Sequence, residues 1–279
     1  MIDNNPFTHT KHRASATNGQ TPCDKLSRPS VRLADLSWQE AERLLTPDTL
    51  IILPLGAAAK EHGPHLRLDN DYRLAEALSG LVMQRTPVIV APTVSFHHYP
   101  AFTSYPGSVS LRFNTARDLI VDIIGSLAAF GPRRFYVLNT GVSTVEPLQA
   151  AAETLRHSQV IVCFTDIQTV AAGVERTVTH QQRGSHADEV ETSMMLYLAP
   201  DRVDMGKAVK DDNPRQGHGG LSRLPGREGI YSPSGVWGDP TLADADKGKR
   251  VVEAIVEGIV REIEALRRVA IDSREPGAS

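Results

Sequence analysis

Short apolar runs and amphipathic stretches alternate along most of this chain. An apolar run of about four to eight residues is typical of a buried strand, whereas apolar residues three and four positions apart are typical of a helix. The patterns predict strands at residues 50–55, 88–91, 108–112, 134–139 and 160–165. They predict helices at residues 37–45, 72–83, 116–130, 147–157, 186–198 and 249–269.

The order of these elements favours one fold class. Parallel neighbours in a sheet need crossover connections, which helices usually supply. We therefore expect an α/β fold with a mostly parallel sheet between two helical layers, a three-layer α-β-α arrangement. Ligands in open α/β sheets bind beyond the carboxyl ends of the strands. The polar residues at 61–71, at 139–143 and at 166, which follow predicted strands, thus indicate where a site would form.

Composition predicts a single domain with two tails. The chain has 279 residues, of which 41% are hydrophobic and 23% charged, enough for one α/β domain with a large core. We expect this domain at residues 32–270. Residues 1–31 are too polar to offset the entropy of ordering, so we expect a disordered N-terminal tail. A flexible C-terminal tail is expected at residues 271–279.

Net charge, the length of the apolar runs and the positions of the cysteines argue against several kinds of partner and site. The net charge is −3 and no long basic run occurs, which argues against nucleic acid and anionic membranes and favours a small-molecule partner. No apolar run approaches the roughly 20 residues that span a bilayer and no secretory signal is evident, so we expect a cytoplasmic protein. Cys23 and Cys163 lie far apart, which argues against a disulfide framework and a cysteine metal site.

The strongest chemical signal follows the strand predicted at residues 50–55. Five metal-ligating or acidic residues occur within eleven positions: Glu61, His62, His65, Asp69 and Asp71. Carboxylates and neutral imidazoles are usual ligands of Zn²⁺ and Mn²⁺, and the Gly-Pro pair at 63–64 would turn the chain so that they converge. The alternative is a polar turn in which Asp71 caps the next helix.

This segment resembles the signature of the creatininase (creatinine amidohydrolase) family. There an apolar strand and a glycine precede Glu-Gln-His-Gly-Pro-His-Leu-Pro-Leu, and an Asp follows the first His at the separation that His62 and Asp71 keep. The resemblance continues in matching order at residues 105–111, 131–139, 186–196, 238–243 and 247–248. It covers about residues 32–268, so the chain is identified as a divergent member of this family with a creatininase-like fold.

The resemblance implies a centre for a divalent metal, zinc or manganese. We predict Glu61, His62 and Asp71 as its ligands. The family's metal-binding Glu stands two residues before the His, where this chain has Lys60. The segment from Gly56 to His62 is one residue longer than is usual in the family, so a local bulge would bring Glu61 to that ligand position.

The second ligand segment of the family is altered. After the strand at 134–139 the family has Asn-Gly-His and a further ligand two residues later, whereas this chain has Val142 and Thr144. Neither is a usual metal ligand. We therefore predict one ion per chain rather than two.

His186 and Glu191 match family positions that include its catalytic His and a nearby acidic residue. The resemblance implies a role in proton transfer, to which His is suited because its unperturbed pKa is about 6.5. Ser185 is predicted to cap the helix that begins here, and Asp188 to accept hydrogen bonds from its first turn.

The substrate is expected to contact two further segments. The region around His98 and Tyr99 borders the substrate pocket in family members, and Asn139 and Ser143 follow a predicted strand. Side chains alternate in an extended segment, so only one of His97 and His98 is expected to line the site.

The resemblance implies an enzyme that hydrolyses the C–N bond of a small cyclic or non-peptidic amide with metal-activated water. The alternative is a non-catalytic small-molecule-binding or structural member that has lost its metal. Family members commonly assemble as hexamers, so we expect a homo-oligomer. The Gly- and Pro-rich stretch at residues 207–240 is interpreted as a lid or subunit contact, or as a plain surface excursion.

Overall fold

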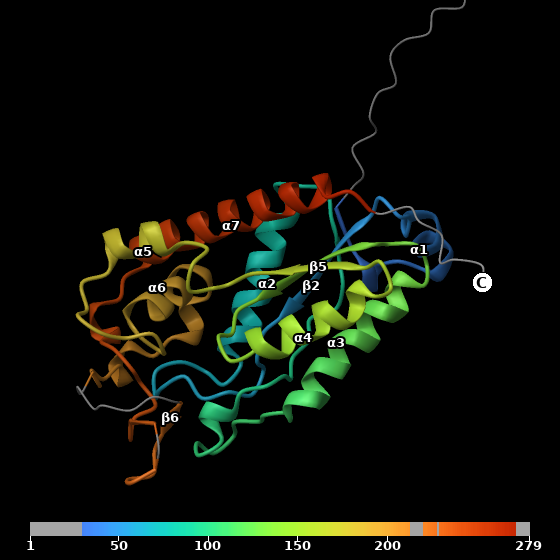
Figure 1. Cartoon of the computed structure of the whole chain (residues 1–279). Helices are drawn as coiled ribbons and strands as arrows, with labels where there is room; N and C mark the ends of the chain where they lie inside the picture. The colour runs from blue at the N-terminus through green and yellow to red at the C-terminus, as the bar shows by residue number, and fades with distance from the viewer. Residues whose placement is uncertain (1–29, 213–219, 228, 272–279) are drawn as a thin grey trace, which may run out of the picture.

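Five parallel strands form the central sheet of the computed structural model, which describes residues 30–212, 220–227 and 229–271 (Figure 1). Their order is β1-β3-β2-β4-β5. The strands are β1 Val31–Arg32, β2 Leu50–Leu55, β3 Ile89–Val90, β4 Arg134–Asn139 and β5 Ile161–Phe164. Leu50 pairs with Arg134 and Leu55 with Asn139, so β2 and β4 end level at the carboxyl edge of the sheet.

Helices cover both faces of this sheet (Figure 1). The helices are α1 Trp38–Leu44, α2 Asn70–Met83, α3 Phe113–Ala128, α4 Val145–Arg156, α5 Ala172–Val178, α6 Glu189–Leu198 and α7 Ala245–Arg268. Side chains alternate along β2: Leu50 and Ile52 pack with α2, α6 and α7, and the other face packs with α3 and α4. The predicted three-layer α/β fold is confirmed.

Shorter elements complete the described residues. The 3-10 helices are Leu33–Asp35, Pro100–Phe102, Pro200–Arg202, Met205–Lys207 and Pro240–Leu242. A separate two-stranded sheet consists of β6 Leu221–Ser222 and β7 Ile230–Tyr231. Nearly all of the two predicted tails lies outside the described residues, as do residues 213–219 and 228 of the Gly- and Pro-rich stretch.

Local sequence explains where two helices begin. The hydroxyl of Ser37 accepts from the backbone N–H of Glu40, and the Glu40 carboxylate accepts from the N–H of Ser37, so the two residues form a capping box at the start of α1. Asp244 caps α7 by accepting from the N–H groups of Asp246 and Lys247. α7 then buries an apolar stripe in the core that it shares with α2 and α6.

The strand predicted at residues 108–112 is wrong. The N–H of Val109 donates to the carbonyl of Ala59 and the N–H of Leu111 donates to that of His97, so the segment bonds two separate loops and forms no ladder. Alternating side chains do not make a strand without a partner strand. The segment instead fastens the loop after β2, because the hydroxyl of Ser108 accepts from the N–H of Glu61 at 2.9 Å.

The helix predicted to begin at His186 begins at Glu189. Ala187 has φ 45°, in the left-handed region that a non-glycine residue rarely adopts, and this interrupts helical geometry. His186 therefore stays outside the helix, in an antiparallel bridge with Trp237. This bridge joins the start of α6 to the end of the Gly- and Pro-rich stretch.

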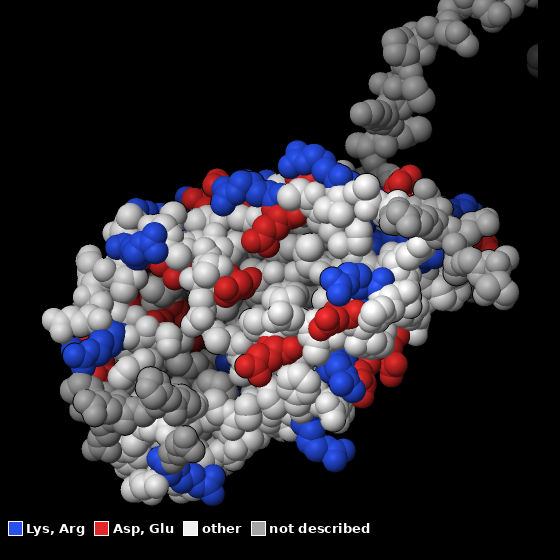
Figure 2. Space-filling model, viewed as in Figure 1, with Lys and Arg blue, Asp and Glu red and all other residues white. Residues whose placement is uncertain are grey.

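The distribution of surface charge and the apolar character of the helices bear on whether a partner could be a nucleic acid or a membrane. On the face shown in Figure 2, basic and acidic side chains are interspersed rather than gathered into one basic patch. Within the described ranges, no helix has both the length and the apolar character needed to cross a bilayer.

Candidate metal centre

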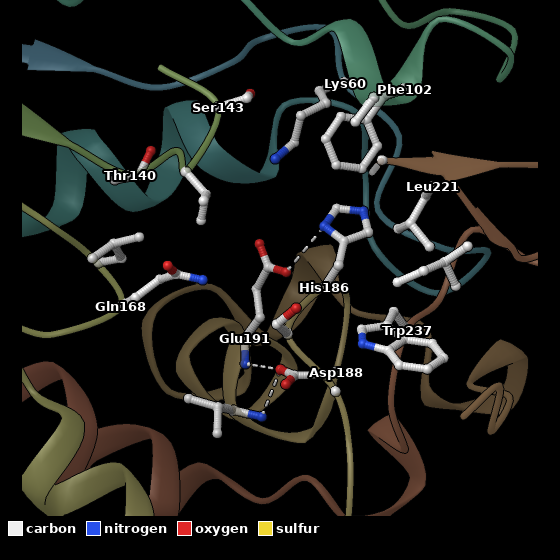
Figure 3. Close-up of a pocket in the computed structure, with 18 of the residues that line it drawn as sticks. Lys60, Phe102, Thr140, Ser143, Gln168, His186, Asp188, Glu191, Leu221 and Trp237 are labelled. Carbon is white, nitrogen blue, oxygen red and sulfur yellow. Dashed lines mark hydrogen bonds and ion pairs between the residues drawn. The ribbon is translucent and has the colours of Figure 1, made fainter. Parts of the chain in front are cut away.

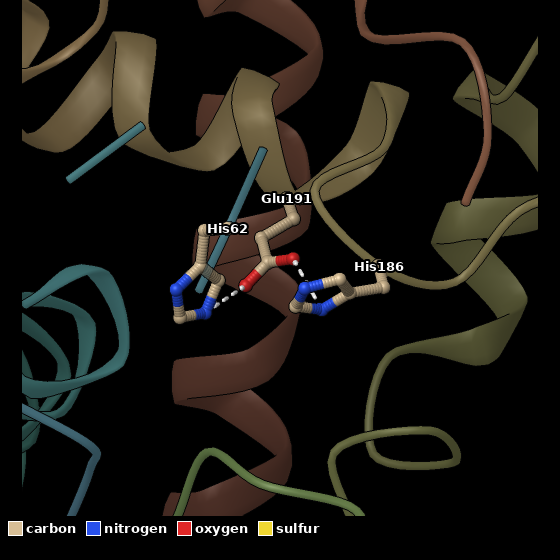
Figure 4. Close-up of side chains that lie close together, drawn as sticks. All are labelled: His62, His186 and Glu191. Carbon is tan, nitrogen blue, oxygen red and sulfur yellow. Dashed lines mark ion pairs between the residues drawn. The ribbon is translucent and has the colours of Figure 1, made fainter. Parts of the chain in front are cut away.

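Three side chains from two distant parts of the chain, the loop after β2 and the start of α6, lie close together (Figure 4). His62 Nε2 lies 3.4 Å from Glu191 Oε1, and His186 Nδ1 lies 3.8 Å from Glu191 Oε2. The ligand atoms of all three residues lie within 4.8 Å of one another. The structure thus joins a residue predicted as a metal ligand with the two predicted for proton transfer.

His62 is oriented by its own loop. Its Nδ1–H donates to the carbonyl of Lys60 at 2.9 Å, which turns Nε2 toward Asp71 Oδ1 at 2.7 Å. Burial by itself would lower the pKa of His62, but the carboxylate of Asp71, helped by Glu191, raises it to about 9 against the opposing charge of Lys60. Nε2 is therefore the point on which two carboxylates converge.

Glu191 is held as an ionised carboxylate in the first turn of α6. Its Oε1 accepts from Asn70 Nδ2 at 3.0 Å and its Oε2 from the N–H of Ala187 at 2.7 Å. Burial would raise the pKa of Glu191, but the neighbouring histidines, His62 foremost, hold it well below its usual range.

Asp188 fixes the start of α6 on which Glu191 depends. Its Oδ1 accepts from the N–H groups of Val190 and Glu191, both at 3.0 Å. The predicted acceptor role of Asp188 is confirmed, and the predicted cap at Ser185 is wrong because Asp188 is itself the N-cap. Burial raises the pKa of Asp188 to about 6.

His186 contacts the residue that was predicted to bind metal beside it. Its Nε2–H donates to the carbonyl of Glu61 at 3.0 Å and lies 3.3 Å from Glu61 Oε2, and its ring centroid is 4.5 Å from that of Phe102. The other carboxylate oxygen of Glu61 accepts from the N–H of Gly63. The structure therefore brings Glu61 to His186, whereas Asp71 contacts His62.

Lys60 occupies the space beside Asp71 that the predicted bulge would have given to Glu61. Lys60 Nζ lies 2.7 Å from Asp71 Oδ2, and both side chains are buried. α2 begins at Asn70 with Asp69 as its N-cap, so the alternative in which Asp71 caps this helix is wrong. The sequence already indicated this difference, because Lys60 stands where the family motif has its metal-binding Glu.

Asn139 and Ser143, both predicted to bind substrate, differ in position. Ser143 lines the cavity next to the metal-centre residues. Asn139 is buried, and its Oδ1 accepts from the N–H of Gly141 at 3.1 Å and from the hydroxyl of Thr144 at 2.6 Å. Its side chain therefore shapes the loop after β4.

His98 contacts this loop through its backbone, and neither His98 nor Tyr99 nor His97 is among the described residues that line the cavity. His98 Nδ1–H donates to the carbonyl of Leu111 at 2.9 Å, and the His98 carbonyl accepts from the hydroxyl of Ser143 at 2.8 Å. Tyr99 is only 2% exposed. Their roles in substrate binding stay predictions.

The cavity has a volume of about 940 Å³, within the range of small-molecule sites. Lys60, His186 and Glu191 project into it from different segments (Figure 3). The described part of the Gly- and Pro-rich stretch supplies Leu221 and Trp237 to its wall. A plain surface excursion does not account for that contact.

Comparison with known proteins gives one family across most of the chain. The family model Creatininase, described as creatinine amidohydrolase, matches residues 34–263. The mycofactocin precursor peptide peptidase of Mycolicibacterium smegmatis is 29% identical over 227 residues, 77% of this chain and 84% of the relative. The creatinine amidohydrolase of Pseudomonas putida is 28% identical over 253 residues, 84% and 96% of the two chains. The 3-dehydro-scyllo-inosose hydrolase of Thermotoga maritima is 31% identical over 268 residues, 85% of each.

Solved structures share the fold. A crystal structure of creatinine amidohydrolase superposes with a TM-score of 0.73 at 25% identity, over 86% of this chain and 99% of that one. A creatininase described as a manganese form has a TM-score of 0.71 at 24% identity, over 86% and 100% of the two chains. A variant creatininase described as a Zn-Zn type has a TM-score of 0.70 at 25% identity, over 86% and 99%.

Proposed function

Because this chain belongs to the creatininase family of hydrolases, we propose that it is a metal-dependent amidohydrolase that acts on a small cyclic or non-peptidic amide. The observation that carries the proposal is the convergence of His62, His186 and Glu191 beside a cavity of about 940 Å³. Buried ionisable groups aimed at one point require a functional reason, because each is costly to bury alone.

The donor set fits a divalent ion such as zinc or manganese. Asp71 Oδ1 and Glu191 Oε1 approach His62 Nε2 at 2.7 and 3.4 Å, and imidazole with carboxylate is a ligand combination that both ions accept. We assign His62 and Glu191 of this cluster, together with Asp71, as the residues that would hold one ion per chain, and His186, the third member of the cluster, as a group beside the ion. Glu61, the third ligand expected from the sequence, is assigned to positioning His186. The solved manganese and Zn-Zn relatives support this choice of metals.

When bound, such an ion supplies a Lewis acid that polarises a carbonyl oxygen and lowers the pKa of a water molecule. His186 is the residue placed for proton transfer. Its Nε2–H donates to the carbonyl of Glu61, so that the lone pair of the neutral ring is on Nδ1, the nitrogen that faces Glu191. In hydrolysis Nδ1 would take a proton from the attacking water and pass it to the leaving nitrogen as the C–N bond breaks, giving a carboxylic acid and an amine.

The test is a substrate screen with metal-loaded protein. Cyclic amides, formamides and short-chain amides are offered, because the named relatives act on different substrates. Turnover that disappears after chelation and returns with Zn²⁺ or Mn²⁺ is the expected result. Turnover that is unaffected by complete removal of metal would refute the proposal.

A second candidate function is a binding or structural protein without metal. Val142 and Thr144 favour it, because neither replaces the ligands that the family has in that loop. Elemental analysis separates the two candidates. Less than about a tenth of an equivalent of metal, after Zn²⁺ and Mn²⁺ have been offered, would favour the second.

The remaining expectations are part of the same proposal. We propose a single domain at residues 32–270, a cytoplasmic location and a homo-oligomer, with a hexamer as the specific assembly. The contact of Trp237 with the site supports an ordered role for part of the Gly- and Pro-rich stretch, which was expected to form a lid or a subunit contact.

A further inference from the structure

Lys60 is an unusual residue to find in the wall of this cavity, because its ammonium is buried. The residue is 6% exposed and its Nζ lies 2.7 Å from Asp71 Oδ2. Nζ also lies 4.7 Å from the ring centroid of Phe102 and 5.7 Å from that of Tyr99, distances at which an aromatic face attracts a cation. Lysine is rarely buried without a compensating partner.

Asp71 divides its two carboxylate oxygens between two partners. Oδ1 lies 2.7 Å from His62 Nε2, where the proposed ion would bind, and Oδ2 lies 2.7 Å from Lys60 Nζ. One carboxylate therefore bridges a metal-ligand position and a fixed ammonium. In metal sites with two ions a carboxylate can bridge the two cations, and here an ammonium takes one side.

The charge around the site balances with one divalent ion. Glu61, Asp71 and Glu191 supply three negative charges when ionised, and their partners are two histidines and Lys60. When the ion binds, its imidazole ligand must be neutral, and with both histidines neutral one divalent ion together with Lys60 compensates all three. A second divalent ion would leave excess positive charge in a buried site, which is strongly unfavourable.

The loop after β4, residues 140–144, offers no carboxylate, imidazole or thiolate ligand for a second ion. Val142 lines the cavity and has no donor atom in its side chain. The hydroxyl of Thr144 is fully buried and shares its single hydrogen between Asn139 Oδ1 at 2.6 Å and the carbonyl oxygen of Gly141 at 2.9 Å. A second ion beside Asp71 would therefore have to displace Lys60 and would find no carboxylate or imidazole ligand in this loop.

We propose that the ammonium of Lys60 is a built-in cation that takes the place of a second divalent ion beside Asp71. The centre is thereby restricted to one ion. Lys60 also gives the cavity a second positive charge that can attract an oxygen atom of the substrate. Figure 3 shows Lys60 and Glu191 pointing their charged ends into the same space. The inference rests on the proposed metal site but not on amide hydrolysis.

The test is a titration of metal-free protein with Zn²⁺, read by calorimetry and by elemental analysis after gel filtration. Wild type and Lys60→Arg, which keeps the charge, should each bind one equivalent. Lys60→Met should bind one equivalent at least tenfold more tightly, because a repelling cation is lost. Lys60→Glu, which places a second carboxylate beside Asp71, should bind two. Lys249→Glu makes the same charge change on an exposed part of α7 and should behave as wild type.

Two equivalents in wild type would overturn the inference, as would one equivalent in Lys60→Glu with unchanged affinity. If Lys60→Glu folds only with metal, it is titrated during refolding, and two equivalents are still expected. No bound ion in any of the proteins would refute the metal site and the inference together. One ion in wild type and two in Lys60→Glu, without turnover of any amide, would refute only the proposed reaction.

Discussion

Replacing His186 with Ala should strongly reduce turnover while leaving folding and metal content largely intact. The side chain donates one hydrogen bond, to the carbonyl of Glu61 at 3.0 Å, and packs on Phe102 with ring centroids 4.5 Å apart. Leaving a buried carbonyl without its donor costs about 1 to 3 kcal/mol, so the variant should fold with moderately reduced stability. Metal content should stay near one equivalent, because His62, Asp71 and Glu191 remain.

Expressed as a free energy, the loss of turnover should exceed the loss of folding stability. A positioned acid–base group typically contributes about 10² to 10⁴ in rate, which corresponds to about 3 to 5 kcal/mol in the barrier. The assay compares kcat of metal-loaded wild type and His186→Ala on the best amide from the screen, with metal content and urea unfolding measured on the same samples. His157→Ala, an exposed histidine at the end of α4, is the matched control.

Two results would refute this reasoning. Turnover at the wild-type rate would show that His186 carries no proton in the reaction. Loss of most of the metal would show that His186 is a ligand, as its place in the cluster of His62, His186 and Glu191 allows.

Three further predictions concern metal binding, the pH dependence of stability and, from the family resemblance, the assembly. His62→Ala should reduce bound metal below about a tenth of an equivalent by elemental analysis, because the point on which Asp71 and Glu191 converge is removed; retention of a full equivalent would contradict this. Burial lowers the pKa of His97 from 6.5 to about 4 in the folded protein, so the unfolded chain binds the proton more tightly. The free energy of unfolding should therefore fall by about 3 kcal/mol as the pH drops from about 6.5 to 4, with no loss above pH 7. Urea unfolding at several pH values should show a smaller acid-induced loss for His97→Gln, and an unchanged loss would refute this. Light scattering should give a homo-oligomer of about six chains, and a monomeric mass would reject that proposal.

The sheet could be predicted because its strands carry a strong local signal. The apolar run of β2 and the run of β4 match the observed strands residue for residue. The helix predicted at residues 37–45 is observed at Trp38–Leu44, with Ser37 as its N-cap. By contrast, α5 has seven residues and β1 has two, too short to produce a clear period.

The errors arose where tertiary contacts decide the backbone. The alternation at residues 108–112 resembles a strand, but its hydrogen bonds go to two loops that the sequence does not place together. The start of α6 was predicted three residues early because nothing local shows that Ala187 adopts a left-handed conformation. That conformation leaves His186 free to face Glu61 and Phe102.

The site was predicted in its residue types but not in its pairings. The spacing of His62 and Asp71 pointed to a metal, and both residues lie together. Glu61 was expected to join them, but the backbone around Gly63, where φ is 69°, turns its carboxylate toward His186. Which of two adjacent side chains faces a cavity depends on loop dihedrals that spacing does not reveal.

The most direct test of the metal-centre assignment is anomalous diffraction at the zinc edge from crystals loaded with Zn²⁺. One peak per chain is expected, about 2.0 to 2.2 Å from His62 Nε2 and from oxygens of Asp71 and Glu191, with Lys60 still against Asp71. Two peaks per chain, a peak elsewhere or no peak after loading would contradict a single-ion centre built on these three residues.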